Sequence, residues 1–139
     1  MNNPYKECLH ELIEFARLED GWGYPKSLGI APDTILRMIR LVDSIEKFFG
    51  YPNIELTPCP LEDGGIDLEI EWGSKTLYIT FWGKAWELGT NVTQKEGDKY
   101  LETKNPASFD PFFKWLSESS VSLQSTAPDE TIVPVPNPL

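Results

Sequence analysis

The sequence predicts an α+β domain with two N-terminal helices, an antiparallel β-meander of about four strands and a C-terminal helix. Apolar residues recur at helical spacing in two segments before residue 50. Apolar and polar residues alternate between residues 66 and 81, as in a half-buried sheet. At 139 residues and 40% apolar composition, the chain suits one domain with a single core. We therefore expect one domain over residues 1–119 and a tail over 120–139.

Two helices are predicted before the sheet. The first runs from Tyr5 to about Leu18, where a loop with two glycines and a proline follows. Its expected buried stripe is Tyr5, Cys8, Leu9, Leu12, Ile13 and Ala16. The second begins at Pro32, which suits a first helical turn, and ends at Gly50, which suits a C-terminal cap. Its stripe is Ile35, Met38, Ile39, Val42, Ile45 and Phe49, widened by Leu36, Leu41 and Phe48.

A β-hairpin with a two-residue turn at Gly73-Ser74 is the clearest predicted feature. The turn sets the register of the two strands, and that register brings apolar residues together on one face. The apolar pairs are Ile70 with Leu77, Leu68 with Ile79 and Ile66 with Phe81, and Trp72 faces Lys75. The opposite face pairs Glu71 with Thr76, Glu69 with Tyr78 and Asp67 with Thr80.

The remaining elements follow from shorter patterns. A strand at 54–56 is expected at a sheet edge, or to end early, because two prolines interrupt it. Gly83-Lys84 predicts a turn into a strand over 85–88, and residues 99–102 predict another after a polar loop over 93–98. Ser108 is expected to cap the last helix. Its apolar residues are Phe109, Phe112, Phe113, Trp115 and Leu116. The Pro/Ser/Thr-rich tail is expected to be flexible, with a docking peptide as the alternative.

Composition restricts the possible partners. The chain has 22 acidic and 12 basic side chains, a net charge of −10, which disfavours nucleic acid because phosphate binding needs clustered cations. No leader or membrane span is expected, so we predict a cytoplasmic location without membrane association. Cys8 and Cys59 do not form a C-x-x-C pair and are expected to be buried free thiols.

The acidity is concentrated in the sheet. Between residues 54 and 90 there are two lysines and seven acidic residues, a net charge of −5, half of the total. The candidate partner-binding residues are Asp67, Glu69 and Glu71, with Tyr78 and Trp82 on the same face if Phe81 points inward. Such a face suits lysine or arginine side chains through charge and cation–π contact. The alternatives are an ordinary solvated sheet face, burial of the aromatic residues under a helix, and a metal or catalytic role.

No catalytic residue, metal site or cofactor is predicted. His10 is the only histidine and lies on the polar side of the first helix. No G-x-S-x-G motif precedes a serine, and the glycine pairs lack the Gly-Lys-Ser/Thr sequence of a phosphate loop. Two carboxylates could act as acid and base, but the sequence indicates no deep cleft for them.

Two short motifs resemble a group of small bacterial proteins that share a D-G-W loop and a D-G-G strand ending in E-W. The motifs are Leu18-Glu19-Asp20-Gly21-Trp22 and Pro58-Cys59-Pro60-Leu61-Glu62-Asp63-Gly64-Gly65-Ile66, followed by Glu71-Trp72. The resemblance spans about residues 9 to 82, and the loop after Trp22 departs from it. It implies a bacterial or phage origin and an accessory protein without assigned chemistry. Turn capping and packing account for Asp20, Trp22, Asp63 and Gly64.

Three function hypotheses follow. The first is a non-enzymatic acidic binding protein of antitoxin or immunity type, whose carboxylate face neutralises a basic partner. The second is a small-molecule-dependent or divalent-metal-dependent enzyme that uses the same carboxylates. The third is an oligomeric scaffold. The sequence does not set the oligomeric state, the ligand or the pathway.

Overall fold

The computed structural model describes residues 3–23, 25–50, 53–84, 87–118 and 122–123. Within them the chain forms α1 (Pro4–Phe15), α2 (Pro32–Phe49), β1 (Glu55–Pro60), β2 (Ile66–Trp72), β3 (Lys75–Lys84), β4 (Glu87–Glu96), β5 (Lys99–Lys104) and α3 (Asp110–Ser117). The strands make one antiparallel sheet in the order β1-β2-β3-β4-β5. The α+β class is confirmed, with five strands in place of the predicted four.

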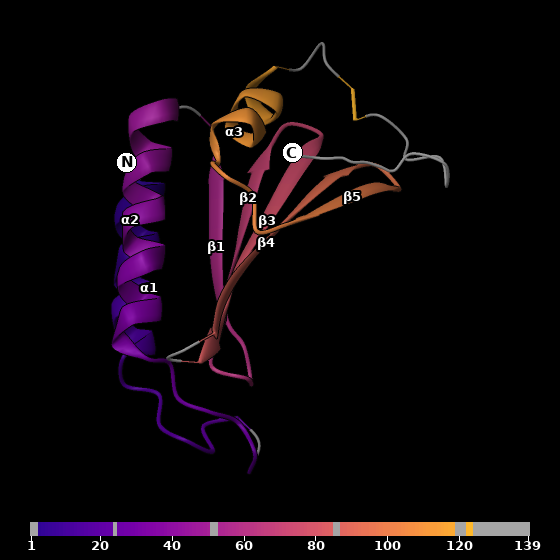
Figure 1. Cartoon of the computed structure of the whole chain (residues 1–139). Coiled ribbons are helices and arrows are strands. Elements are labelled where there is room, and N and C mark those ends of the chain that lie inside the picture. Colours follow the sequence, from indigo (N-terminus) through magenta and orange to yellow (C-terminus); the bar gives the residue numbers. More distant parts are fainter. Residues whose placement is uncertain (1–2, 24, 51–52, 85–86, 119–121, 124–139) are drawn as a thin grey trace.

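The fold has two layers (Figure 1). Helices α1 and α2 lie side by side against one face of the sheet, and α3 packs on the same face near the turn between β2 and β3. We call this the inner face. Its strand residues Ile66, Leu68, Ile70, Leu77, Ile79, Phe81 and Val92 are buried in the core. The opposite face, here called the outer face, is not covered by any helix that the structure describes.

The predicted hairpin is confirmed at each of its seven residue pairs, from Trp72 with Lys75 to Ile66 with Phe81. Gly73 in the turn has a φ of 62°, a conformation that glycine adopts without strain. Side chains alternate between the two faces of a strand. Burial of Leu68 and Leu77 on the inner face therefore places Glu69 and Tyr78 on the outer face.

The strands after the hairpin differ from the prediction. β3 continues through Gly83-Lys84, where a turn was expected, and β4 includes residues 93–96, expected as a polar loop. Its turn to β5 is at Gly97, whose φ is 65°. The predicted strand over 85–88 overlaps the start of β4, and the rest of β4 was missed because Val92 is the only strongly apolar residue of its second half; pairing with strands on both sides holds this segment in the sheet.

The edge strand β1 continues through both prolines. Pro58 is opposite Leu68 and Pro60 is opposite Ile66, so the edge position is confirmed and the early end is wrong. Proline has no backbone N–H to donate, but an edge strand needs ladder hydrogen bonds on one side alone. The prolines also limit pairing of this edge with another strand.

The helix boundaries agree closely with the sequence. Asn3 Oδ1 accepts hydrogen bonds from the amides of Tyr5 and Lys6 and so caps α1, as expected of an asparagine N-cap. α1 ends at Phe15, three residues early, because residues 16–18 bond back three residues rather than four. α2 has the predicted limits, and Gly50, with a φ of 71°, is its cap.

The predicted helix stripes were too wide. Ile13, Leu36 and Phe48 are exposed, and Ala16 lies beyond the end of α1. The buried residues of α1 are Tyr5, Cys8 and Leu12, and those of α2 are Thr34, Ile35, Met38, Leu41, Val42 and Ile45. Adjacent helix positions are about 100° apart, so the neighbour of a buried residue such as Leu12 turns toward solvent.

Helix α3 begins at Asp110, with Phe109 rather than Ser108 at the N-cap position and no side-chain cap. Its buried residues Phe113, Trp115 and Leu116 close over the inner face, whereas Phe112 is half-buried and Phe109 precedes the helix. The end of α3 is held by Lys75, which is 2% exposed. Its Nζ donates hydrogen bonds to the carbonyl oxygens of Trp115 at 2.7 Å and Glu118 at 2.5 Å. A cation at this position also complements the negative end of the helix dipole.

The loop that follows the first motif of the sequence resemblance contacts the second motif. The amide of Leu28, in the loop after Trp22, donates to the carbonyl oxygen of Glu62 at 2.7 Å. Within the loop, Trp22 Nε1 donates to the carbonyl of Leu28 at 2.7 Å, and Asp20 Oδ1 accepts from the amide of Gly29 at 2.9 Å. In the turn, Asp63 Oδ1 accepts from the amide of Gly65 at 2.9 Å. These residues therefore have structural roles in two adjoining loops.

The structure also shows the positions of the two cysteines and of part of the predicted tail. Cys8 is a buried free thiol, as predicted, but Cys59 is exposed because it points outward from an edge strand. Of the predicted tail over 120–139, only residues 122–123 are described, and Leu123 is buried and donates its amide to Glu96 Oε1. The rest of the tail, and the first two residues of the strand predicted over 85–88, lie outside the described residues. No described helix combines the length and the apolar character needed to span a membrane.

Candidate functional site

The outer face brings all five predicted partner-binding residues together. Asp67, Glu69 and Glu71 alternate along β2, and Tyr78 and Trp82 lie on the adjacent strand β3. All five are half-buried. Alternate residues of a strand are separated by about 7 Å, so the three carboxylates form a regular row.

Two of these carboxyl groups have raised pKa values. Burial raises the pKa of Asp67, although Thr80 Oγ1 donates a hydrogen bond to its Oδ1 at 2.6 Å and opposes the shift. Partial burial also raises the pKa of Glu71, and the carboxylates of Glu69 and Glu55 raise it further. Glu55 lies directly opposite Glu71 on β1. The outer face therefore holds negative charges close enough to repel one another.

Cations compensate this charge only in part. Among the paired residues 66–81 of the hairpin, no lysine or arginine lies on the outer face, as the sequence predicts. Lys95 on β4 pairs with Thr76, one strand beyond Glu71, and lowers the pKa of Glu71 against the larger opposing effects. The Lys95 ammonium also lies 5.6 Å from the centre of the Tyr100 ring, a cation–π distance.

The two aromatic residues of the face differ in their surroundings. Burial and the carboxylate of Glu69 raise the pKa of the Tyr78 hydroxyl, so it stays a neutral donor at physiological pH. Trp82 lies over Gly89, where any side-chain carbon would overlap the indole ring. Its Nε1 is buried and has no hydrogen-bond partner in the described part of the chain.

Other candidate chemistry has no geometric support in the described residues. His10 is exposed on α1, as predicted. Burial, with a smaller effect of Glu11, raises the pKa of Cys8 to about 12, so its thiol is protonated and unreactive. Over the described ranges, no group of three or more His, Cys, Asp or Glu side chains is placed to hold a metal ion.

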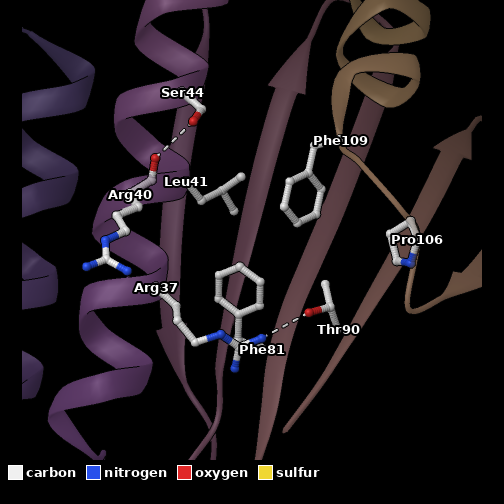
Figure 2. Close-up of a pocket in the computed structure, with 8 residues that line it drawn as sticks. All are labelled: Arg37, Arg40, Leu41, Ser44, Phe81, Thr90, Pro106 and Phe109. Carbon is white, nitrogen blue, oxygen red and sulfur yellow. Dashed lines mark hydrogen bonds between the residues drawn. The ribbon is translucent and has the colours of Figure 1, made fainter.

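A second site was missed by sequence reasoning. A cavity of about 340 Å³ lies on the inner side of the sheet, between α2, strands β3 and β4, and the segment before α3 (Figure 2). Leu41, Phe81, Pro106 and Phe109 form its apolar walls. Its polar residues are Arg37, Arg40, Ser44 and Thr90. The one signal in the sequence is a pair of arginines three residues apart, which lie on the same side of a helix.

Arg37 is the central polar residue of this cavity. Its guanidinium carbon lies 4.4 Å from the centre of the Phe81 ring. Its Nη2 donates a hydrogen bond to Thr90 Oγ1 at 3.1 Å (Figure 2). Its Nη1 is buried and has no hydrogen-bond partner among the residues that the structure describes. Burial lowers the pKa of Arg37, but a guanidinium keeps its charge at neutral pH.

Comparison of the chain with protein-family models, with curated proteins and with solved structures gave no match in any of the three. The resemblance to the D-G-W group therefore stays a prediction. Function is argued below from the residues and their geometry.

Proposed function

We propose that the chain is a non-enzymatic binding protein whose outer sheet face binds a basic protein partner, in the manner of an antitoxin or immunity inhibitor. The observation that supports this most is the row Asp67, Glu69 and Glu71 on a face without a described helix. Partial burial raises the pKa of Glu71, and the carboxylates of Glu69 and Glu55 raise it further, so Glu71 lies among other negative charges. A bound lysine or arginine would supply positive charge next to these carboxylates.

The geometry favours an extended basic segment as the occupant. Side chains on one side of an extended chain repeat about every 7 Å, the same spacing as the carboxylates of β2. Tyr78 lies beside Glu69 and offers an aromatic ring next to a carboxylate. Arginine side chains use this combination of ring stacking and charge. Charge complementarity of this kind increases the association rate and sets partner choice.

The test compares two triple variants with the same change of charge. The sheet carboxylates are Asp67, Glu69 and Glu71, and the helix carboxylates are Glu7, Glu11 and Glu14, which are exposed on α1. Changing each set to Asn or Gln removes three negative charges. Wild-type protein and both variants are used as bait in the cells of origin, and captured proteins are identified by mass spectrometry.

The proposal predicts a basic protein that wild type and the helix variant capture and the sheet variant does not. Capture should weaken as salt is raised, because partly exposed charges are screened. Equal capture by the two variants would show that overall charge, and not this face, is responsible. Capture of no basic protein by folded wild-type bait would contradict the proposal directly.

A further inference from the structure

The cavity around Arg37 has two arginines in its lining, although it lies on the inner side of the sheet, where the core is apolar. It lies on the helix side of the sheet, so it is separated from the outer face by the sheet itself. The chain has ten more acidic than basic side chains. Even so, the ion pairs between described side chains, Arg17 with Glu14 and Lys47 with Asp43, do not include either arginine of the cavity.

The free end of the Arg37 guanidinium indicates what could bind. Phe81 and Thr90 fix the guanidinium by a cation–π contact and a hydrogen bond from Nη2. Nη1 keeps two N–H groups without a described partner, although the atom is buried. Leaving a buried charged donor unpaired is unfavourable, and an anion in the cavity would remove that cost.

The walls determine the kind of anion. Leu41, Phe81, Pro106 and Phe109 are apolar, so an inorganic ion would leave most of the lining without contacts. A volume of about 340 Å³ is near the lower limit of small-molecule sites. One fixed guanidinium matches one negative charge, and its planar fork suits a carboxylate. Arg40 also borders the cavity, on the next turn of α2, but its guanidinium is directed away from Phe81 and Phe109 (Figure 2).

We infer that this cavity binds a small organic carboxylate, with the carboxylate on Arg37 Nη1 and the apolar part between Phe81, Phe109 and Leu41. This inference does not depend on the proposed function of the outer face. Without a ligand, the hydrogen bond from Arg37 to Thr90 connects α2 to β4. A bound ligand would add contacts between these two elements.

The test is an NMR titration of the full chain with three probes. Benzoate has both a carboxylate and a ring, benzamide has the same shape without charge, and acetate has the charge without the ring. Benzoate should cause saturable shifts at Arg37, Phe81 and Thr90, with an affinity at least about tenfold higher than either other probe. Equal binding of benzamide and benzoate, or no saturable shift with benzoate, would overturn the inference.

Two variants with matched charge assign the effect to Arg37. Arg37→Gln should reduce the benzoate affinity about tenfold or more, and Arg17→Gln, at an exposed position just after the end of α1, should leave it unchanged. Equal loss in both variants would indicate long-range charge and refute the site. If Arg37→Gln does not fold, Arg37→Lys keeps the charge without the planar fork and should still weaken binding; unchanged affinity there would refute the assigned contact. The probe comparison on wild type needs no variant.

Discussion

Replacement of Lys75 by methionine should destabilise the fold by removing the cap of α3. Lys75 Nζ donates to the carbonyls of Trp115 and Glu118, and its ammonium lies 4.7 Å from the centre of the Trp115 ring. Methionine fills nearly the same volume but cannot donate a hydrogen bond. The variant would therefore leave two carbonyl groups at the end of α3 without this donor.

The expected loss follows from two opposing effects. Each buried carbonyl left unsatisfied costs about 1–3 kcal/mol, which sets an upper range of about 2–6 kcal/mol for the pair. The loss is smaller than that, because the Trp115 carbonyl keeps a hydrogen bond from the amide of Glu118 at 3.3 Å. Part of this loss is offset, because folding of the methionine variant does not require the removal of an ammonium group from water. Water that reaches the half-buried carbonyl of Glu118 recovers more. We expect Lys75→Met to lower the free energy of unfolding by about 2–4 kcal/mol.

Urea unfolding followed by tryptophan fluorescence measures this difference. Lys99→Met is the control, since Lys99 is exposed at the start of β5, and its free energy of unfolding should change by less than about 0.5 kcal/mol. The slope with denaturant should be the same in all three proteins, so that the midpoints can be compared. A Lys75→Met protein as stable as wild type would show that removing the ammonium from water costs as much as its hydrogen bonds contribute, and would refute the reasoning.

Two further predictions follow from the shifted pKa values. Because the folded-state pKa of Glu71 is raised, the folded protein binds more protons than the unfolded one just above the ordinary glutamate pKa, and stability falls as pH rises through that interval. Glu71→Gln should flatten this part of the curve of unfolding free energy against pH, by less than about 1 kcal/mol because the side chain is partly exposed; an unchanged curve would contradict the repulsion. For the thiols, an alkylating reagent at mildly alkaline pH should modify the exposed Cys59 and spare Cys8, whose pKa is about 12. Intact mass should show one adduct in native protein and two in urea, and fast modification of native Cys8 would disprove its burial.

The hairpin could be predicted in full because two independent constraints agree. Period-two alternation assigns each residue to a face, and the two-residue turn at Gly73 then leaves one register. β4 lacked the first constraint, since its second half is mostly polar on both faces. It is a central strand all the same, because β3 and β5 supply partners for its backbone. Neither partner can be deduced from the β4 sequence itself.

The inward position of Lys75 follows from the register, but its burial does not. A lysine on an inner face is unfavourable unless acceptors reach it, and those acceptors come from the end of α3, 40 or more residues later in the chain. The same limitation applies to Arg37, whose partner Thr90 is 53 residues away. Sequence spacing identifies which residues share an element's face. It does not identify which distant element meets that face.

The outer face was the easier site to predict because all its residues belong to one hairpin. Their placement on a single face is confirmed, and their role in binding stays a proposal. For Trp82, the structure adds a contact that the sequence prediction did not include. Sequence placed it as a contact residue, whereas the structure shows the indole lying over Gly89, which was not considered. Trp82 is half-buried, as is Tyr78, and contact of either residue with a partner stays a proposal.

The most direct test of the outer face is an NMR titration of side-chain carboxyl signals with a short peptide that has lysine at alternate positions. The account predicts saturable shifts at the sheet carboxylates and the Tyr78 ring, and a fall in the pKa of Glu71 toward its ordinary value. The helix carboxylates should shift little, although they belong to the same acidic protein. Equal or larger shifts at the helix carboxylates, or an unchanged Glu71 pKa at saturation, would contradict the claim that this face binds a basic partner.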